Sequence, residues 1–188
     1  MVQTFADSET ERFYAAGKSR RVPTEIRKRA AMRLLQLNAA TRIEDLRLPP
    51  SNRLEQLHGD RAGQWSMRIN DQWRVCFRFK NGDAFDVEIA DYHQGDSIMA
   101  NKGLPAIHPG EFLAETLEEL GFSQAAFARA IGVSPMRISH VVKGARPVTA
   151  ELALLFGRAF DQSPQYWLNL QADHDLKTAE ASIGPRLR

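Results

Sequence analysis

The spacing of apolar residues divides this chain of 188 residues into two parts. Between Arg53 and Ile89, apolar and polar residues alternate, most clearly in Trp73–Phe79, and this period of two predicts half-buried β-strands. After about Leu104, apolar residues recur every three or four positions, which predicts amphipathic helices. The chain therefore changes character between Ala90 and Leu104, and we expect a separate domain on each side.

The first part is expected to be an α+β domain, with two helices packed on a small antiparallel sheet. Asp7 and Ser8 both offer N-cap oxygens for a first helix that ends near Gly17, and Thr24 can cap a second one. Asn70-Asp71 and Asn81-Gly82-Asp83 separate the predicted strands, and Asn-Gly is a strong signal for a tight hairpin.

The alternation also places arginine side chains together on one face of the predicted sheet. Arg74 and Arg78 fall opposite the apolar residues of their strand, and Arg68 falls opposite the apolar residues of the preceding strand. A solvated sheet face would have the same pattern, so the arginines alone do not indicate a site.

Residues suited to RNA cleavage occur near these arginines in the sequence. Attack by a 2′-OH group requires a base, an acid and cations that stabilise the phosphorane. Histidine and tyrosine can exchange protons, whereas arginine clamps phosphate. Asp91, Tyr92 and His93, together with His58 and Arg61, supply these residue types.

These candidates lie within an ordered series of motifs that resembles the HigB toxins of the RelE-like superfamily. The motifs are Ile43–Leu48 followed by Pro49-Pro50, then Arg53–Arg61, Trp65–Asn70, Trp73–Val75 and Asp91–His93. The resemblance implies a RelE-like fold and a ribosome-dependent mRNA endoribonuclease without metal or another cofactor. It also implies that the site comprises His58, Arg61, Arg68, Arg74, Asp91, Tyr92 and His93. Whether His58, Tyr92 or His93 is the base or the acid stays open.

The helical part contains a predicted helix-turn-helix. One helix is expected after Ser123, Gly132-Val133-Ser134 forms a tight turn, and Ser134-Pro135 begins a short helix with an N-cap followed by proline. Residues 94–103 are polar and lack periodicity, so we expect domains at 1–93 and 104–188 joined by a linker at 94–103.

Outward residues of this motif are candidates for contact with DNA, although a solvent-facing helical bundle would also expose polar side chains. Base edges are within reach of the short helix, and phosphates within reach of helix N-termini and the following loop. The candidates are Ser123, Gln124, Ser134, Met136, Arg137, Ser139, His140, Lys143 and Arg146.

A second series of motifs is similar to the HigA antitoxins with an Xre-type helix-turn-helix. It comprises Gly110–Leu113, Phe122–Gln124, Ile131–Ser134, Ile138-Ser139, Val142–Thr149 and Tyr166–Leu168. The resemblance implies a protein that binds its toxin and represses their common operon through operator DNA.

Charge and composition narrow the possible partners. Residues 1–93 contain 16 Lys and Arg against 13 Asp and Glu, a net charge of +3, whereas the remainder contains 9 against 10. The near-neutral second part favours a homodimer, since pairing doubles its phosphate contacts. The lone Cys76 excludes an internal disulfide, and no apolar run is long enough to cross a bilayer, so we expect a cytoplasmic protein.

Two functions are therefore considered for the chain. The first is a toxin and its antitoxin joined in one chain, in which the two parts bind each other and the nuclease is silenced. The alternative is a DNA-binding repressor whose first domain is a non-catalytic sensor or scaffold.

Overall fold

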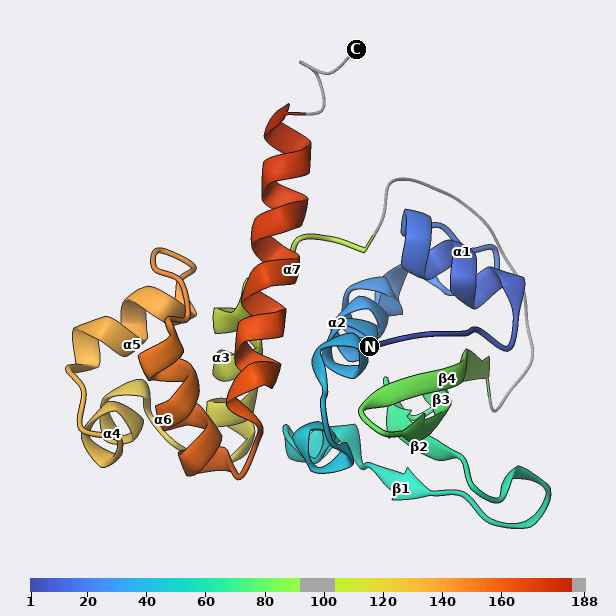
Figure 1. Ribbon diagram of the computed structural model, residues 1–188, viewed down its shortest axis with the longest axis horizontal. Coiled ribbons are helices and arrows are strands. Elements are labelled where there is room, and N and C mark those ends of the chain that lie inside the picture. The colour runs from blue at the N-terminus through green and yellow to red at the C-terminus, as the bar shows by residue number, and fades with distance from the viewer. Residues whose placement is uncertain (92–103, 184–188) are drawn as a thin grey trace. The chain divides into compact units, whose positions relative to one another are not determined.

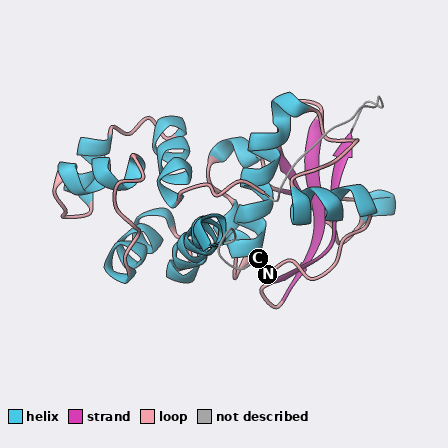
Figure 2. Cartoon of the chain, turned by 90° about the horizontal axis from the view of Figure 1, so that it is seen from above, coloured by secondary structure: helices cyan, strands magenta, loops and turns pink. Residues whose placement is uncertain are grey.

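The computed structural model describes residues 1–91 and 104–183, and the chain divides into two compact units (Figure 1). The first unit consists mainly of residues before 105, and the second mainly of residues after 106. All strands of the described chain belong to the first unit, and the second is helical (Figure 2). The predicted fold class, an α+β domain followed by an all-α helix-turn-helix domain, is confirmed.

The first unit contains an antiparallel sheet in which sequence neighbours are also neighbours in space. Its strands are β1 (Glu55–Gln56), β2 (Trp65–Arg68), β3 (Trp73–Lys80) and β4 (Asp83–Asp91), in the order β1-β2-β3-β4. Asn81 and Gly82 join β3 to β4 with φ values of 54° and 84°. A two-residue hairpin of type I′ requires positive φ at both positions, so this turn was predictable from its residues.

Helices α1 (Ser8–Ala16) and α2 (Arg27–Ala39) pack against this sheet. Asp7 accepts a hydrogen bond from the backbone N–H of Thr10, and Gly17 ends α1 in the left-handed conformation. Thr24 does not cap α2 through its side chain. It begins the 3₁₀ turn η1 (Thr24–Ile26), which leads directly into α2.

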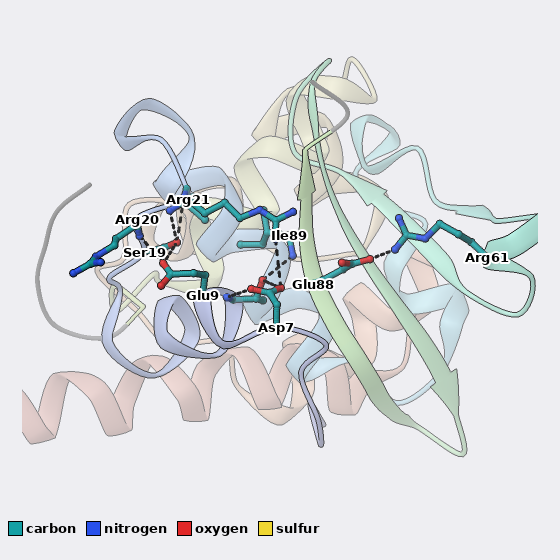
Figure 3. A network of polar contacts seen from close by, with 10 residues as sticks. Asp7, Glu9, Ser19, Arg20, Arg21, Arg61, Glu88 and Ile89 are labelled. Atoms are coloured by element: carbon teal, nitrogen blue, oxygen red, sulfur yellow. Dashed lines mark hydrogen bonds and ion pairs between the residues drawn. The ribbon is translucent and has the colours of Figure 1, made fainter. Parts of the chain in front are cut away.

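The segment after α1 is fixed by a carboxylate. Glu9 Oε2 accepts hydrogen bonds from Ser19 Oγ at 3.1 Å and from the backbone N–H of Arg20 at 2.6 Å (Figure 3). The Arg20 N–H is the largest of the effects that lower the pKa of Glu9. This contact connects α1 to the segment that leads toward α2.

The interior of the first unit contains a buried cation that the sequence pattern did not predict. Arg33 of α2 is 0% exposed, and its Nη1 donates to Gln36 Oε1 at 3.1 Å. Its Nη2 donates to Ser51 Oγ at 3.1 Å, and its Nε donates to the carbonyl oxygen of Arg68 at 3.3 Å. Arg33 therefore connects α2 both to the end of β2 and to the 3₁₀ turn η3 (Pro50–Asn52).

The second unit is helical, and the helix starts expected at Ser123 and Ser134 are confirmed. Its helices are α3 (Pro109–Glu119), α4 (Gln124–Ala130), α5 (Pro135–Val142), α6 (Ala150–Phe160) and α7 (Pro164–Ile183). Ser123, Ser134 and Thr149 cap α4, α5 and α6. Helix α7 extends well beyond the buried residues near its start, and its later turns are mostly polar and exposed.

Helix α3 crosses α5 at a position where no side chain fits. A Cβ atom built on Gly110 would lie 1.9 Å from the carbonyl oxygen of Val141. Real Cβ atoms do not approach backbone oxygen so closely, so glycine at this position permits the contact between the helices. The α5 residues Ile138 and Val141 are both 0% exposed.

Candidate functional site

The face of the sheet opposite the helices carries the arginines that the alternation predicted. We call Arg61, Arg68, Arg74 and Arg78 the arginine face; the last three lie on strands, and Arg61 ends the 3₁₀ turn η4 (Gly59–Arg61). Arg68 is the direct partner of Arg74 in the β2–β3 ladder, so both side chains emerge on the same side.

Glu88 and Ile89, which are adjacent on β4, have side chains on opposite faces of the sheet. The backbone N–H of Ile89 donates to Thr10 Oγ1 of α1 at 2.9 Å, and the Ile89 side chain is 1% exposed. Glu88 projects to the other side, where its carboxylate forms an ion pair with Arg61 (Figure 3). The arginine face is therefore the side not covered by α1.

Strand register aligns a row of polar residues across this face. Glu55, Ser66, Cys76 and Glu88 are successive ladder partners on β1, β2, β3 and β4. Arg74 reaches toward one end of the row: its Nε donates to Ser66 Oγ at 2.8 Å, and its Nη2 lies 2.6 Å from Glu55 Oε1. Arg61 pairs with Glu88 at the other end. The row thus has a carboxylate at each edge, and each carboxylate holds one arginine.

Cys76 lies between these two ion pairs. Burial raises the pKa of its thiol above the usual range, and the guanidinium groups of Arg61 and Arg74 oppose that shift. The thiol is 0% exposed, so it packs beneath the arginines. Arg61 and Arg74 therefore both act on this thiol, although their carboxylate partners lie at opposite ends of the row.

The other two arginines of the face are also held by carboxylates. Arg68 forms an ion pair with Asp71, and Arg78 Nε lies 3.5 Å from Asp86 Oδ2. Arg78 also donates to the carbonyl oxygen of Ala62 at 3.3 Å. These contacts hold the guanidinium groups in defined positions, and a phosphate that binds them must compete with the carboxylates.

The structure does not gather all the expected catalytic residues around this face. His58 is exposed in the loop before η4, and no side-chain hydrogen bond from it caps that turn. Asp91 is the ladder partner of Trp73, which is buried on the helix-covered side, and its Oδ1 accepts from Gln72 Nε2 at 3.0 Å. Tyr92 and His93 lie outside the described residues.

The polar residues that position the arginines are not among the site residues expected from the sequence. Glu55, Ser66 and Glu88 stand at polar positions of the alternating pattern, so their face was predictable. Their pairing with particular arginines was not, because it depends on the register between strands.

The helix-turn-helix of the second unit comprises α4, α5 and the turn between them. Gly132 adopts a φ of 75° in this turn, and the backbone N–H of Val133 donates to the carbonyl of Ala128 at 2.9 Å. Ser134 Oγ accepts from the backbone N–H of Arg137 at 3.3 Å and caps α5. Met136 is 68% exposed at the start of α5, while Ser139 and His140 are half-buried on later turns.

The candidate phosphate contacts surround this motif. Ser123 caps α4, with Gln124 as its first residue, and both Lys143 and Arg146 are exposed after α5. The carbonyl of His140 accepts from the backbone N–H groups of Ala145 at 2.8 Å and Arg146 at 3.2 Å, which fixes the loop. The backbone that carries Arg146 is therefore held against the end of α5.

Arg137 differs from these exposed cations because it is held by a carboxylate. Its Nη2 lies 2.6 Å from Glu151 Oε2 and 3.5 Å from Thr149 Oγ1, at the start of α6. The hydrogen bond with Glu151 is the main cause that raises the pKa of Arg137, and the same bond lowers the pKa of Glu151. Both groups are therefore charged at neutral pH.

Within residues 1–91 and 104–183, no three His, Cys, Asp or Glu side chains are grouped so that they could hold a metal ion. No helix there combines the length and the apolar character needed to cross a bilayer.

Comparison with known proteins relates each part of the chain to a different family. Residues 3–93 match the RelE-like toxin HigB of type II toxin-antitoxin systems, and residues 113–167 match a helix-turn-helix family. The chain is 33% identical to the Endoribonuclease HigB of Proteus vulgaris, over 50% of this chain and 100% of that protein.

Two further relatives were compared with the chain. The chain is 49% identical to Virulence-associated protein I of Dichelobacter nodosus, over 45% of this chain and 80% of that protein. It is 37% identical to Antitoxin HigA-1 of Vibrio cholerae, over 36% of this chain and 64% of that protein.

Proposed function

Since the chain belongs to the RelE-like HigB toxins over residues 3–93 and to a helix-turn-helix family over residues 113–167, we propose that it is a type II toxin-antitoxin module in one chain. The first part is an mRNA endoribonuclease that acts on the ribosome. The second part neutralises it and binds operator DNA to repress transcription. The domains are proposed to be residues 1–93 and 104–188, with 94–103 as the linker.

The observation that carries the nuclease proposal is the arginine face. On this sheet face Arg74 is paired with Glu55 and Arg61 with Glu88, on opposite sides of Cys76, so two guanidinium groups are held at fixed places. Guanidinium groups bind phosphate through two parallel hydrogen bonds, which suits them to the dianionic phosphorane formed when a 2′-OH attacks. The carboxylates position the arginines before RNA binds, and the phosphates of the RNA backbone then replace the carboxylates as partners of the arginines.

The proposed site comprises His58, Arg61, Arg68, Arg74, Asp91, Tyr92 and His93. His58, Tyr92 and His93 supply the groups that can exchange protons, so cleavage proceeds without a metal ion. Asp91 comes immediately before this pair, and its contact with Gln72 fixes the end of β4 from which Tyr92 and His93 continue.

The repressor proposal rests on the capped α5 and the cations around it. Arg137, Ser139 and His140 are proposed to reach base edges, together with Ser134 and Met136 at the helix start. Ser123, Gln124, Lys143 and Arg146 are proposed to contact phosphates. A homodimer through this unit would double the phosphate contacts that a nearly neutral module makes.

Joining the two parts in one chain raises the concentration of the antitoxin part near the toxin part. A linker of this length spans at most about 35 Å and keeps the antitoxin near the toxin at an effective concentration of roughly millimolar. Inhibition of the nuclease would then not depend on the amounts of two separate proteins.

The test compares the full chain with residues 1–93 expressed under tight control. We expect the fragment to stop growth and to produce new mRNA 5′ ends within translated regions, and the full chain to do neither. The matched variants His93→Ala and Tyr92→Ala should abolish cleavage by the fragment without changing its circular dichroism. A folded but harmless wild-type fragment would instead support a repressor with a non-catalytic first domain.

A further inference from the structure

We propose that Glu151 is a positioning residue for operator recognition, which fixes the guanidinium of Arg137 for a base edge and keeps it from binding phosphate. The inference rests on the proposed repressor function and adds a residue outside the helix-turn-helix itself. Glu151 lies on α6, whereas Arg137 lies on α5.

The position of Arg137 on α5 makes its orientation important. It is the third residue of that helix, and recognition helices contact bases through their N-terminal residues. A guanidinium reads guanine only when two of its donors align with the O6 and N7 acceptors. An arginine that samples many rotamers pays an entropic cost for this alignment at binding.

The contacts of Arg137 restrict that freedom while leaving donors for DNA. Its Nη2 is engaged by Glu151 Oε2 at 2.6 Å and lies 3.5 Å from Thr149 Oγ1. A guanidinium has five N–H donors, so Nε and Nη1 are available to a base edge while the ion pair persists. Thr149 Oγ1 also accepts from the backbone N–H of Leu152 at 3.4 Å, so the partners of Arg137 are fixed to the first turn of α6.

The charge of Glu151 supplies the second half of the inference. Non-specific binding to DNA depends on cations that replace counterions along the phosphates. Lys143 and Arg146 are exposed and have no ion-pair partner among the described residues, so they suit that role. Arg137 is neutralised by Glu151, whose side chain is 66% exposed and would repel a phosphate. Arg137 should therefore contribute to base reading more than to general attraction.

The experiment measures binding of the full chain to two duplexes of equal length. One is the duplex that the full chain protects in a footprint of the DNA upstream of its own coding sequence, and the other has the same bases in scrambled order. Anisotropy titrations over a range of salt concentrations are made for wild type, Glu151→Gln and the control Glu118→Gln. Glu118 is an exposed residue of α3, so its variant removes the same charge at another place.

We expect Glu151→Gln to bind the scrambled duplex about threefold more tightly and with a steeper salt dependence, because Arg137 gains a phosphate contact. Its preference for the protected duplex should fall about tenfold, the size of one lost base contact. In an Arg137→Ala background, Glu151→Gln should leave the preference unchanged. Thermal unfolding of Glu151→Gln should match wild type, because the ion pair is exposed.

Other outcomes would overturn the proposal. If Glu151→Gln and Glu118→Gln change the affinity for both duplexes equally, Glu151 acts only through the net charge of the chain. A higher preference in Glu151→Gln would mean that the ion pair competes with DNA rather than preparing Arg137 for it. A wild-type chain that protects no upstream DNA would refute the repressor function itself, and this inference with it.

Discussion

Arg74 Nη2 lies 2.6 Å from the carboxylate of Glu55. Arg74 is on β3 and Glu55 is on β1, and these two strands are not neighbours in the sheet. The ion pair spans β2, whose Ser66 accepts a hydrogen bond from the same guanidinium. Arg74 also donates to the carbonyl oxygen of Arg53 at 3.0 Å. The positions of Glu55 and Ser66 beside Arg74 follow from the register of the ladder.

We predict that Arg74→Lys lowers mRNA cleavage by residues 1–93 about tenfold and that Arg74→Ala lowers it about a hundredfold. Lysine keeps the charge but loses the fork that binds two phosphate oxygens, and alanine loses both. Mapping of 5′ ends in a translating extract measures the rate. Glu55→Gln is the control, since it removes the carboxylate partner and leaves the arginine. Wild-type cleavage by both Arg74 variants would exclude this arginine from the site.

Gly110→Ala should destabilise the second unit and weaken DNA binding together. The added methyl would meet the carbonyl oxygen of Val141 at 1.9 Å, so α3 and α5 must separate. Overpacking of this kind costs about 1–3 kcal/mol in the free energy of unfolding. Urea unfolding of the full chain followed by circular dichroism measures the loss, and Glu118→Ala on the same helix is the control. Unchanged unfolding would show that the helices can part without cost.

His108 makes the stability of the second unit depend on pH. Its Nδ1 accepts a hydrogen bond from the backbone N–H of Gly110 at 2.9 Å and caps α3, which requires a neutral ring. Burial lowers the pKa of His108, and the neighbouring His174 adds to this effect, while Asp175 and Glu111 oppose it. The unfolded chain therefore binds a proton at a higher pH than the folded chain.

We predict that the unit is most stable above about pH 6.5, the usual histidine value, and loses stability as the pH falls below it. Below the lowered pKa of His108, the folded state is also protonated and the dependence on this group ends. His108→Asn should retain a cap and remove this pH dependence, whereas His108→Ala should lose about 1 kcal/mol at neutral pH. Thermal unfolding between pH 5 and pH 8 distinguishes the variants. An unchanged pH profile in His108→Asn would assign the dependence to other groups.

Arg33→Met should destabilise the first unit although it preserves much of the buried volume. The acceptors on Gln36, Ser51 and the Arg68 carbonyl would lose a donor inside the protein, at a cost of about 2–3 kcal/mol. Urea unfolding of residues 1–93 measures the change, and Arg29→Met, at an exposed position of α2, is the control. Equal stability of both variants would mean that the buried guanidinium contributes no net stabilisation.

Patterns confined to one stretch of chain were sufficient to predict most elements. The hairpin at Asn81 and Gly82, and the caps at Asp7, Ser123 and Ser134, follow from interactions between residues a few positions apart. The fold class also follows, because alternating apolar residues require one buried sheet face and helical periodicity requires one buried helix face. The same alternation separated Arg68, Arg74 and Arg78 from the core, whereas Arg61 lies outside the strands.

The tertiary structure decided which residues meet across long stretches of chain. Strand register brought Glu55 to Arg74, helix packing brought Gly110 against Val141, and the start of α6 brought Glu151 to Arg137. Local periodicity places a side chain on a face, but its partner depends on loop lengths and on how the elements pack. The sequence by itself therefore determined the two folds and the face that carries Arg68, Arg74 and Arg78. Only the packed chain added Arg61 to that face and determined what holds each arginine in place.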